Sequence, residues 1–236
     1  MLKIQKVYTV IPFPIWGIIT CLLPLFGFIL CVLIAITFHF DEATKTHCNV
    51  WNFLPSISAA VGDSTPERYI WRFCIAYHCL PRTVIIPSFY WTYYAEMAQQ
   101  IKQRGFDMAF RFAIFLHVLE NLALVSLTFV SSSENYSIHE KSFITFMVSA
   151  TLYMLLTIYI QQSARKVITF NSAQERAFTV KVFACLTNIS VFIFSIYLFL
   201  RHNTHCEPGS KSFSLRSMIL KLISFLNFSI FMVCCL

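Results

Sequence analysis

Charged residues are scarce in this chain. They make up 12% of its 236 residues, whereas an ordinary soluble domain carries roughly 25%. Glycine and proline are also few, at 5 and 8 residues, while 57% of the residues are hydrophobic. Too little polar surface exists to cover a soluble globule of this size. The composition therefore excludes a soluble domain and predicts an integral membrane protein.

The chain also lacks basic blocks, internal repeats and a signal-peptide cleavage site, and each absence excludes a type of partner or domain organisation. No long block of basic residues accompanies the net charge of +7, so we expect no nucleic-acid partner. No internal repeat, low-complexity tract or linker interrupts the chain, which predicts one multi-pass membrane domain over residues 1–236. No small-residue cleavage site follows the first apolar run, so we expect that run to remain as a signal anchor.

Apolar runs of about 20 residues recur along the whole chain, and each can cross about 30 Å of hydrocarbon as a helix. A membrane barrel would instead show short segments of alternating hydrophobicity. The predicted fold class is therefore all-α, a polytopic transmembrane bundle of about six helices. The expected spans are Ile15–Phe38, Tyr69–Tyr94, Ala109–Val130, Phe143–Gln161, Val182–Leu200 and Ser217–Leu236.

Basic residues orient these spans, because Lys and Arg are enriched in cytoplasmic loops. One predicted side carries Lys3, Lys6, Lys102, Arg104, Arg111, Arg165, Lys166, Arg176 and Lys181. The other side carries Lys45, Arg68, Lys141, Arg201, Lys211 and Arg216. The first set is larger, which predicts a cytosolic N-terminus and lumenal first, third and fifth loops. Lys221 inside the last span weakens this pattern at the C-terminus.

Two of the nine cysteines, Cys48 and Cys206, fall in loops predicted on the oxidising side. A disulfide between them is expected there. The alternatives are two free thiols, or a metal site that includes His47 and His205. No loop histidines show the HxxxH spacing of a helical site, so we expect no metal. Asn135 opens an Asn-Tyr-Ser sequon in the third loop and is a predicted glycosylation site.

Ionisable side chains inside a span are costly and mark functional candidates. The second span carries four of them: Arg68, Arg72, His78 and Arg82. Arg68 and Arg72 share a face near the predicted lumenal end, and His78 lies about 15 Å deeper, near the bilayer midplane. Arg82 follows His78 by one turn on the same face. The prolines in this span are expected to kink or loosen the helix around a cavity.

The third span also carries polar residues, because His117, Glu120 and Asn121 form a stripe along one face of the predicted helix. Glu120 is the one acid within a predicted span, and its expected partner is Arg72 or Arg82. Two interpretations stay open. In the first, the ion pair between Glu120 and its arginine only fixes the register of the two helices. In the second, the helices enclose a polar pocket, in which arginines bind a phosphate and a His–Glu pair transfers protons.

Longer segments then carry a resemblance to a known family. They are His47–Ser58, Pro66–Phe73, His78–Arg82, Glu120–Leu124, Val130–Glu134, Ile138–Glu140, Arg201–Asn203 and Cys206-Glu207. In content and order they resemble the post-GPI-attachment-to-proteins factor two family, which is related to the N-terminal module of a yeast cell-wall remodelling protein. The resemblance covers about residues 15–209, whereas residues 210–236 diverge from the family's usual final helix.

The resemblance implies a multi-pass protein of the Golgi membrane, with the endoplasmic reticulum as an additional location. It implies a role in remodelling glycosylphosphatidylinositol (GPI) anchors, where lyso-GPI receives a saturated chain at sn-2. The implied partners are membrane lipids, lyso-GPI-anchored proteins and other subunits of the pathway. No resident cofactor is expected, and acyl-CoA or a lipid would donate the acyl chain.

With that substrate, each polar residue acquires an expected role. His78 would act as general base with Glu120 orienting it, and Asn121 or Asn203 would supply an oxyanion contact. The expected phosphate-binding residues are Arg68, Arg72, Arg82 and Arg201. Three functions stay open: an acyltransferase, a non-catalytic subunit that presents lyso-GPI to a separate enzyme, and a lipid transporter.

Overall fold

The computed structural model describes residues 13–44, 55, 57–62, 64–101, 104–167 and 169–205. These residues form helices and connections without a strand, which confirms the all-α prediction. The helices are α1 (Phe13–Phe38), α2 (Phe40–Ala43), α3 (Ile57–Gly62), α4 (Glu67–Ile101), α5 (Arg104–Phe129), α6 (Tyr136–Arg165) and α7 (Ser172–His205).

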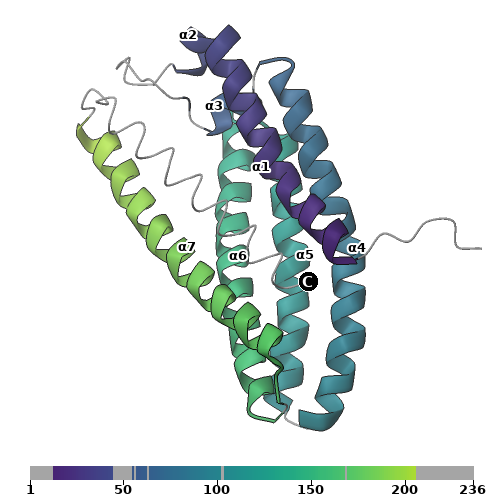
Figure 1. Ribbon diagram of the computed structural model, residues 1–236. Helices are drawn as coiled ribbons and strands as arrows, with labels where there is room; N and C mark the ends of the chain where they lie inside the picture. The colour runs from purple at the N-terminus through teal and green to yellow at the C-terminus, as the bar shows by residue number, and fades with distance from the viewer. Residues whose placement is uncertain are drawn as a thin grey trace, which may run out of the picture.

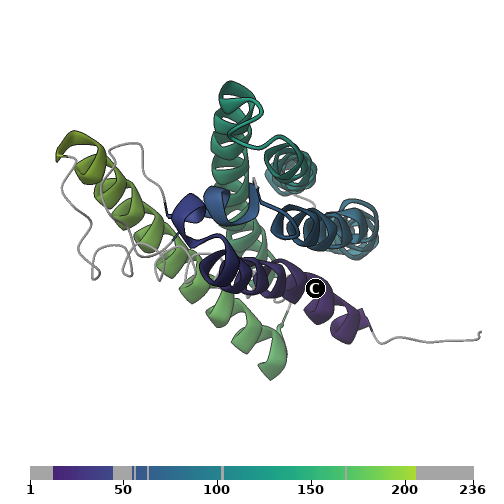
Figure 2. The ribbon, with the colours of Figure 1, turned by 90° about the horizontal axis from the view of Figure 1, so that it is seen from above.

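The long helices alternate in direction along the bundle (Figure 1). We call the end that holds α2, α3 and the α5–α6 connection the upper end, as it is drawn in Figure 1. The α4–α5 and α6–α7 connections lie at the lower end. Helices α4 and α7 lie on opposite sides of the α5–α6 pair, as the view from above also shows (Figure 2). The loops thus alternate between ends as predicted, and their orientation across the membrane stays a prediction.

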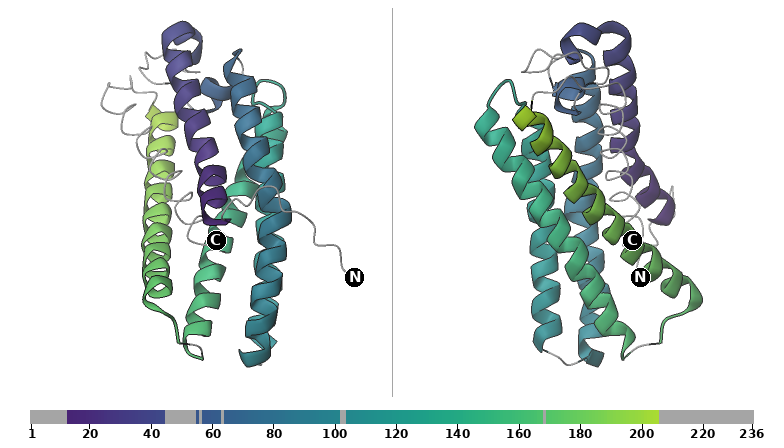
Figure 3. Two further views of the ribbon diagram at one scale, coloured as in Figure 1. Left: turned by 45° about the vertical axis from the view of Figure 1, so that its right-hand side comes forward. Right: turned by 90° about the vertical axis from the view of Figure 1, so that its left-hand side faces the viewer.

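Within the part of the chain that the structure describes, four helices are long and apolar enough to cross a membrane: Gly17–Phe38, Gly105–Phe129, Tyr136–Arg165 and Ser172–Phe194. The described part of α4, which carries Arg68, Arg72 and Arg82, is not among them. Helix α4 packs against α1 on one side and α5 on the other (Figure 3). Its neighbours cover the charged side, while Tyr69, Phe73 and Leu80 are exposed on the other. The sixth predicted span, Ser217–Leu236, lies outside the described residues.

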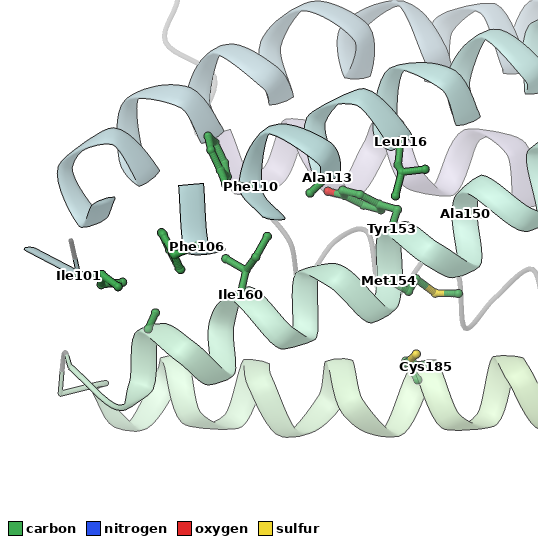
Figure 4. Packing of buried hydrophobic residues seen from close by; sticks show 12 residues of the cluster. Ile101, Phe106, Phe110, Ala113, Leu116, Ala150, Tyr153, Met154, Ile160 and Cys185 are labelled. Carbon is green, nitrogen blue, oxygen red and sulfur yellow. The ribbon is translucent and has the colours of Figure 1, made fainter. Parts of the chain in front are cut away.

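Two apolar cores hold the described helices together. In the lower half, Phe106 and Phe110 of α5 pack against Tyr153 and Ile160 of α6, and Cys185 of α7 joins them (Figure 4). The second core lies in the upper half and links α1, α3, α4 and α5. Its members include Phe28, Cys31, Ala60, Trp71 and Leu124.

A glycine sets the distance between α1 and α4. A Cβ atom added at Gly27 would lie 2.9 Å from both the Cβ and the Sγ atoms of Cys74. Any larger residue at position 27 would force the two helices apart. Small residues at such crossings let membrane helices approach closely.

The predicted kink in the second span is not reflected in its secondary structure. Helix α4 continues through Pro81 and Pro87 as one α-helix from Glu67 to Ile101. Proline removes a backbone donor, but membrane helices tolerate it where neighbouring helices support the affected turn. Here α1 and α5 flank α4 and provide that support.

Candidate functional site

A chain of buried polar contacts joins α1, α4 and α5. The Nδ1 atom of His78 lies 2.8 Å from the carbonyl oxygen of Thr20 on α1. One turn further along α4, Arg82 donates from Nη1 to Nε2 of His78 at 2.7 Å, and from Nη2 to Oε1 of Glu120 at 3.0 Å. The exposed fractions of His78, Arg82 and Glu120 are 4%, 1% and 0%. Of the two expected partners of Glu120, Arg82 is therefore the one that binds it.

Hydrogen-bond chemistry assigns the proton on His78. A carbonyl oxygen can only accept, so Nδ1 of His78 carries the proton that it shares with Thr20. The other nitrogen, Nε2, presents its lone pair to Arg82. That lone pair is the one that a general base would use. His78 and Glu120 are linked through Arg82, so the expected base role of His78 requires Arg82 to move away.

Helix α5 extends this polar layer. The Nε2 atom of His117 donates to the carbonyl oxygen of Arg82 at 3.1 Å, and the His117 ring packs 5.1 Å from that of Tyr153. Nδ2 of Asn121 donates to the carbonyl oxygen of His117 at 3.0 Å. Among the described residues, His117 Nδ1, Glu120 Oε2 and Asn121 Oδ1 are buried without a hydrogen-bond partner. Since buried polar atoms are normally paired, this layer can accept a donor such as a hydroxyl or water.

Arg72 ties the upper ends of α4 and α5 together. Its Nη2 atom donates to the carbonyl oxygen of Phe129 at 2.8 Å and lies 3.6 Å from Oε2 of Glu134. The N–H of Ser131 donates to Glu134 at 3.0 Å and lowers the pKa of that exposed carboxyl. Arg72 therefore holds the end of α5 in place, in addition to any phosphate binding.

Arg68, the other upper arginine, is half-buried like Arg72. Its guanidinium lies 5.6 Å from the ring centre of Tyr69, a cation–π contact. The Nε atoms of Arg68 and Arg72 are both buried without a hydrogen-bond partner among the described residues. Both residues thus lie at the same end of α4, as predicted, and retain donors for an anionic group.

Sequence reasoning missed a second buried carboxylate. Glu67 is fully buried at the start of α4, and its Oε1 atom lies 2.7 Å from Nδ1 of His39, just after α1. The thiol of Cys31 donates to the backbone carbonyl of Glu67 at 3.3 Å. Glu67 precedes the expected span Tyr69–Tyr94, so it was not singled out among the ionisable residues inside spans. Its position in the first turn of a helix, next to the end of another span, was the available signal.

The remaining predicted residues divide between described and undescribed parts. Asn135 is exposed and caps α6, with its Oδ1 atom accepting from the N–H of Ile138 at 3.1 Å. Arg201 and Asn203 belong to the upper part of α7, and the structure does not describe their side chains. Cys48 and Cys206 lie outside the described residues. The glycosylation, the disulfide and the roles of the α7 residues stay predictions.

Comparison with known proteins places the chain in a family. The profile of the Frag1/DRAM/Sfk1/Cwh43P N-terminal domain matches residues 12–236. This match extends beyond residue 209, where the resemblance found from motifs ended. A relative from Danio rerio named Acyltransferase PGAP2 is 37% identical over 199 residues, which cover 84% of each chain. The chain is a multi-pass membrane protein, and it belongs to the Frag1/DRAM/Sfk1/Cwh43P family.

Further relatives carry related names. Post-GPI attachment to proteins factor 2 of Caenorhabditis briggsae is 40% identical over 189 residues, covering 79% of this chain and 71% of its own. Acyltransferase PGAP2 of Xenopus tropicalis is 37% identical over 200 residues, covering 84% and 77%. No solved structure matches the chain.

Proposed function

We propose that this chain acts in the fatty-acid remodelling of GPI anchors, by reacylating lyso-GPI at sn-2 with a saturated chain in the Golgi membrane. The observation that carries the proposal is a set of ionisable groups at two depths of the bundle: Arg68 and Arg72 at the upper end, and the buried chain from His78 to Glu120 below them. Ionisable groups inside an apolar bundle cost several kcal/mol unless they are paired, and they are functional candidates by default. The names of the relatives indicate the pathway.

The charge distribution suits an anionic lipid that enters from the side of the bundle. Its phosphate would lie at the upper end, where the Nε donors of Arg68 and Arg72 have no partner among the described residues. Arg201, in the upper part of α7, is a further proposed phosphate ligand. The acyl chains would follow the apolar helix surfaces toward the middle of the bilayer. We propose no resident cofactor; an acyl thioester or an acyl lipid is the co-substrate.

One observation favours a second function, a lipid-binding subunit that presents lyso-GPI to a separate acyltransferase. The basic nitrogen of His78 is occupied by Arg82, so the buried chain offers no free base in the arrangement observed. A presenter needs the upper arginines and the packed helices, and needs no free base.

Acyl transfer by the purified chain in lipid nanodiscs distinguishes the two functions. The reaction contains lyso-GPI and labelled stearoyl-CoA or labelled distearoyl phosphatidylcholine, and lyso-GPI binding is measured in parallel. Transfer by the unaltered chain is expected, and its absence with lyso-GPI still bound would establish the presenter instead. Arg68→Ala is expected to weaken lyso-GPI binding. Arg176→Ala, near the start of α7 at the lower end, is the matched control that should leave binding unchanged.

A further inference from the structure

The hydroxyl group that accepts the acyl chain and the side chain of His78 are expected at different depths of the bilayer. The sn-2 hydroxyl of lyso-GPI belongs to the glycerol, which lies at the edge of a hydrocarbon layer about 30 Å thick. His78 lies about 15 Å along α4 below Arg68, close to the middle of the bundle. Groups that react with the glycerol hydroxyl are therefore expected at the upper end.

A serine and a histidine meet at that end. The Oγ atom of Ser58 on α3 lies 3.4 Å from Nε2 of His139, in the first turn of α6. Nδ1 of His139 lies 2.8 Å from the carbonyl oxygen of Val130, which can only accept. The proton of His139 is therefore on Nδ1, and the lone pair of Nε2 faces the Ser58 hydroxyl. A serine, a basic imidazole nitrogen and a group that orients the imidazole form the arrangement that activates a nucleophile.

Rigid elements hold both side chains while leaving them accessible. Ala60 and Val61, on the same short helix as Ser58, are buried in the upper core. His139 is fixed by the capped first turn of α6, where its backbone N–H donates to the carbonyl oxygen of Asn135 at 3.0 Å. Ser58 and His139 are both half-buried, in contrast to the fully enclosed His78.

We propose that Ser58 is the nucleophile that carries the acyl group and that His139 is its general base. The inference rests on the proposed function and names the residues that perform its chemistry. Both residues belong to segments singled out in the sequence, but motif and spacing gave neither of them a catalytic role.

The reaction has two balanced halves. In the first, Ser58 Oγ attacks the carbonyl carbon of the donor's ester or thioester while Nε2 of His139 takes the serine proton. The bond to the donor's alcohol or thiol breaks, and that leaving group takes the proton from His139. In the second half, His139 takes the proton of the sn-2 hydroxyl, whose oxygen attacks the acyl-serine ester. Ser58 leaves with that proton, and the lipid gains one ester bond.

The test first omits the acyl acceptor. The full chain in nanodiscs is incubated with stearoyl-CoA, or separately with distearoyl phosphatidylcholine, labelled in the acyl chain. We expect the label to become covalently bound to the Ser58 peptide, and lyso-GPI added afterwards to remove it. The donor that gives the adduct identifies the class of the co-substrate.

Variants separate catalysis from folding. Ser58→Ala is expected to lose the adduct and to lower transfer at least about 100-fold, with thermal stability unchanged. Ser58→Cys retains a nucleophile and is expected to form an adduct that neutral hydroxylamine releases faster than the serine ester. His139→Gln is expected to lower the rate of adduct formation. Ser126→Ala is the control, because Ser126 pairs with Ser142 at 2.8 Å, a hydroxyl pair with no base.

Each outcome decides something different. Transfer by the unaltered chain without an adduct at Ser58, or full transfer by Ser58→Ala, would overturn this inference and leave the proposed function intact. No transfer by the unaltered chain with either donor would refute the acyltransferase function, and this inference with it. Loss of transfer in His78→Ala with the Ser58 adduct preserved would give the deep chain a role after acylation.

Discussion

Removing Arg82 should destabilise this protein more than removing any exposed arginine. Arg82 is 1% exposed and binds Glu120, which is 0% exposed, at 3.0 Å. Arg82→Leu leaves a buried carboxylate and the Nε2 atom of His78 without their partner. Breaking a buried ion pair from one side costs about 3–5 kcal/mol, because the remaining charge is uncompensated. We therefore expect a loss of about that size in the free energy of unfolding.

The double variant Arg82→Leu, Glu120→Leu tests the reasoning. Replacing both members of a buried pair with apolar residues is often neutral, so stability should recover to within about 2 kcal/mol of the unaltered protein. The control is Arg111→Leu. Arg111 also contacts a carboxylate, Asp107, at 3.0 Å, but the two side chains are 63% and 52% exposed. Such a pair contributes below about 1 kcal/mol.

Unfolding can be followed by titrating the protein with sodium dodecyl sulfate in mixed micelles and measuring circular dichroism and tryptophan fluorescence. The pair is coupled if the losses of the two single variants do not add in the double variant. A double variant that is as unstable as the sum of Arg82→Leu and Glu120→Leu would refute the argument. A stable double variant that no longer supports remodelling would show that the buried pair serves lipid chemistry rather than stability.

Three further predictions concern other parts of the bundle. Gly27→Ala should lower stability by about 1–3 kcal/mol, because the added Cβ meets α4 at 2.9 Å, whereas Gly105→Ala meets nothing within 4 Å and should not lower it. Thermal unfolding of both variants in the same detergent compares them, and equal effects would contradict the close approach of α1 and α4. Asn135→Gln should abolish a glycosidase-sensitive mass shift in protein made in cells, since it removes the sequon. Cys48→Ser should lower thermal stability under non-reducing conditions if Cys48 and Cys206 form the expected disulfide, and an unchanged midpoint would refute it.

The predicted and observed helices agree because each long apolar run is helical by itself in a membrane. Backbone polar groups in hydrocarbon must be satisfied within the segment, so the first, third, fourth and fifth spans follow from the local sequence. An observed helix can extend beyond its predicted span, as Tyr136–Arg165 extends beyond Phe143–Gln161, because interfacial residues continue the helix past the apolar run.

The polar stripes were also visible in the sequence, since a spacing of three or four residues places side chains on one face. The spacing fixes neither the distance nor the rotation between two helices. It therefore left Arg72 and Arg82 as equal partners for Glu120. The structure decides for Arg82, because Arg72 lies about 15 Å further up α4 and binds the end of α5 instead.

Composition and hydropathy alone determined that this chain is a helical membrane protein with a few costly charges inside it. These are properties of each segment, because the cost of transfer into hydrocarbon is set residue by residue. Only the tertiary structure decided that Arg82 occupies the basic nitrogen of His78 and that Ser58 meets His139, 81 residues away in the sequence. Such contacts depend on how the helices pack across the bundle, and no single segment contains that information.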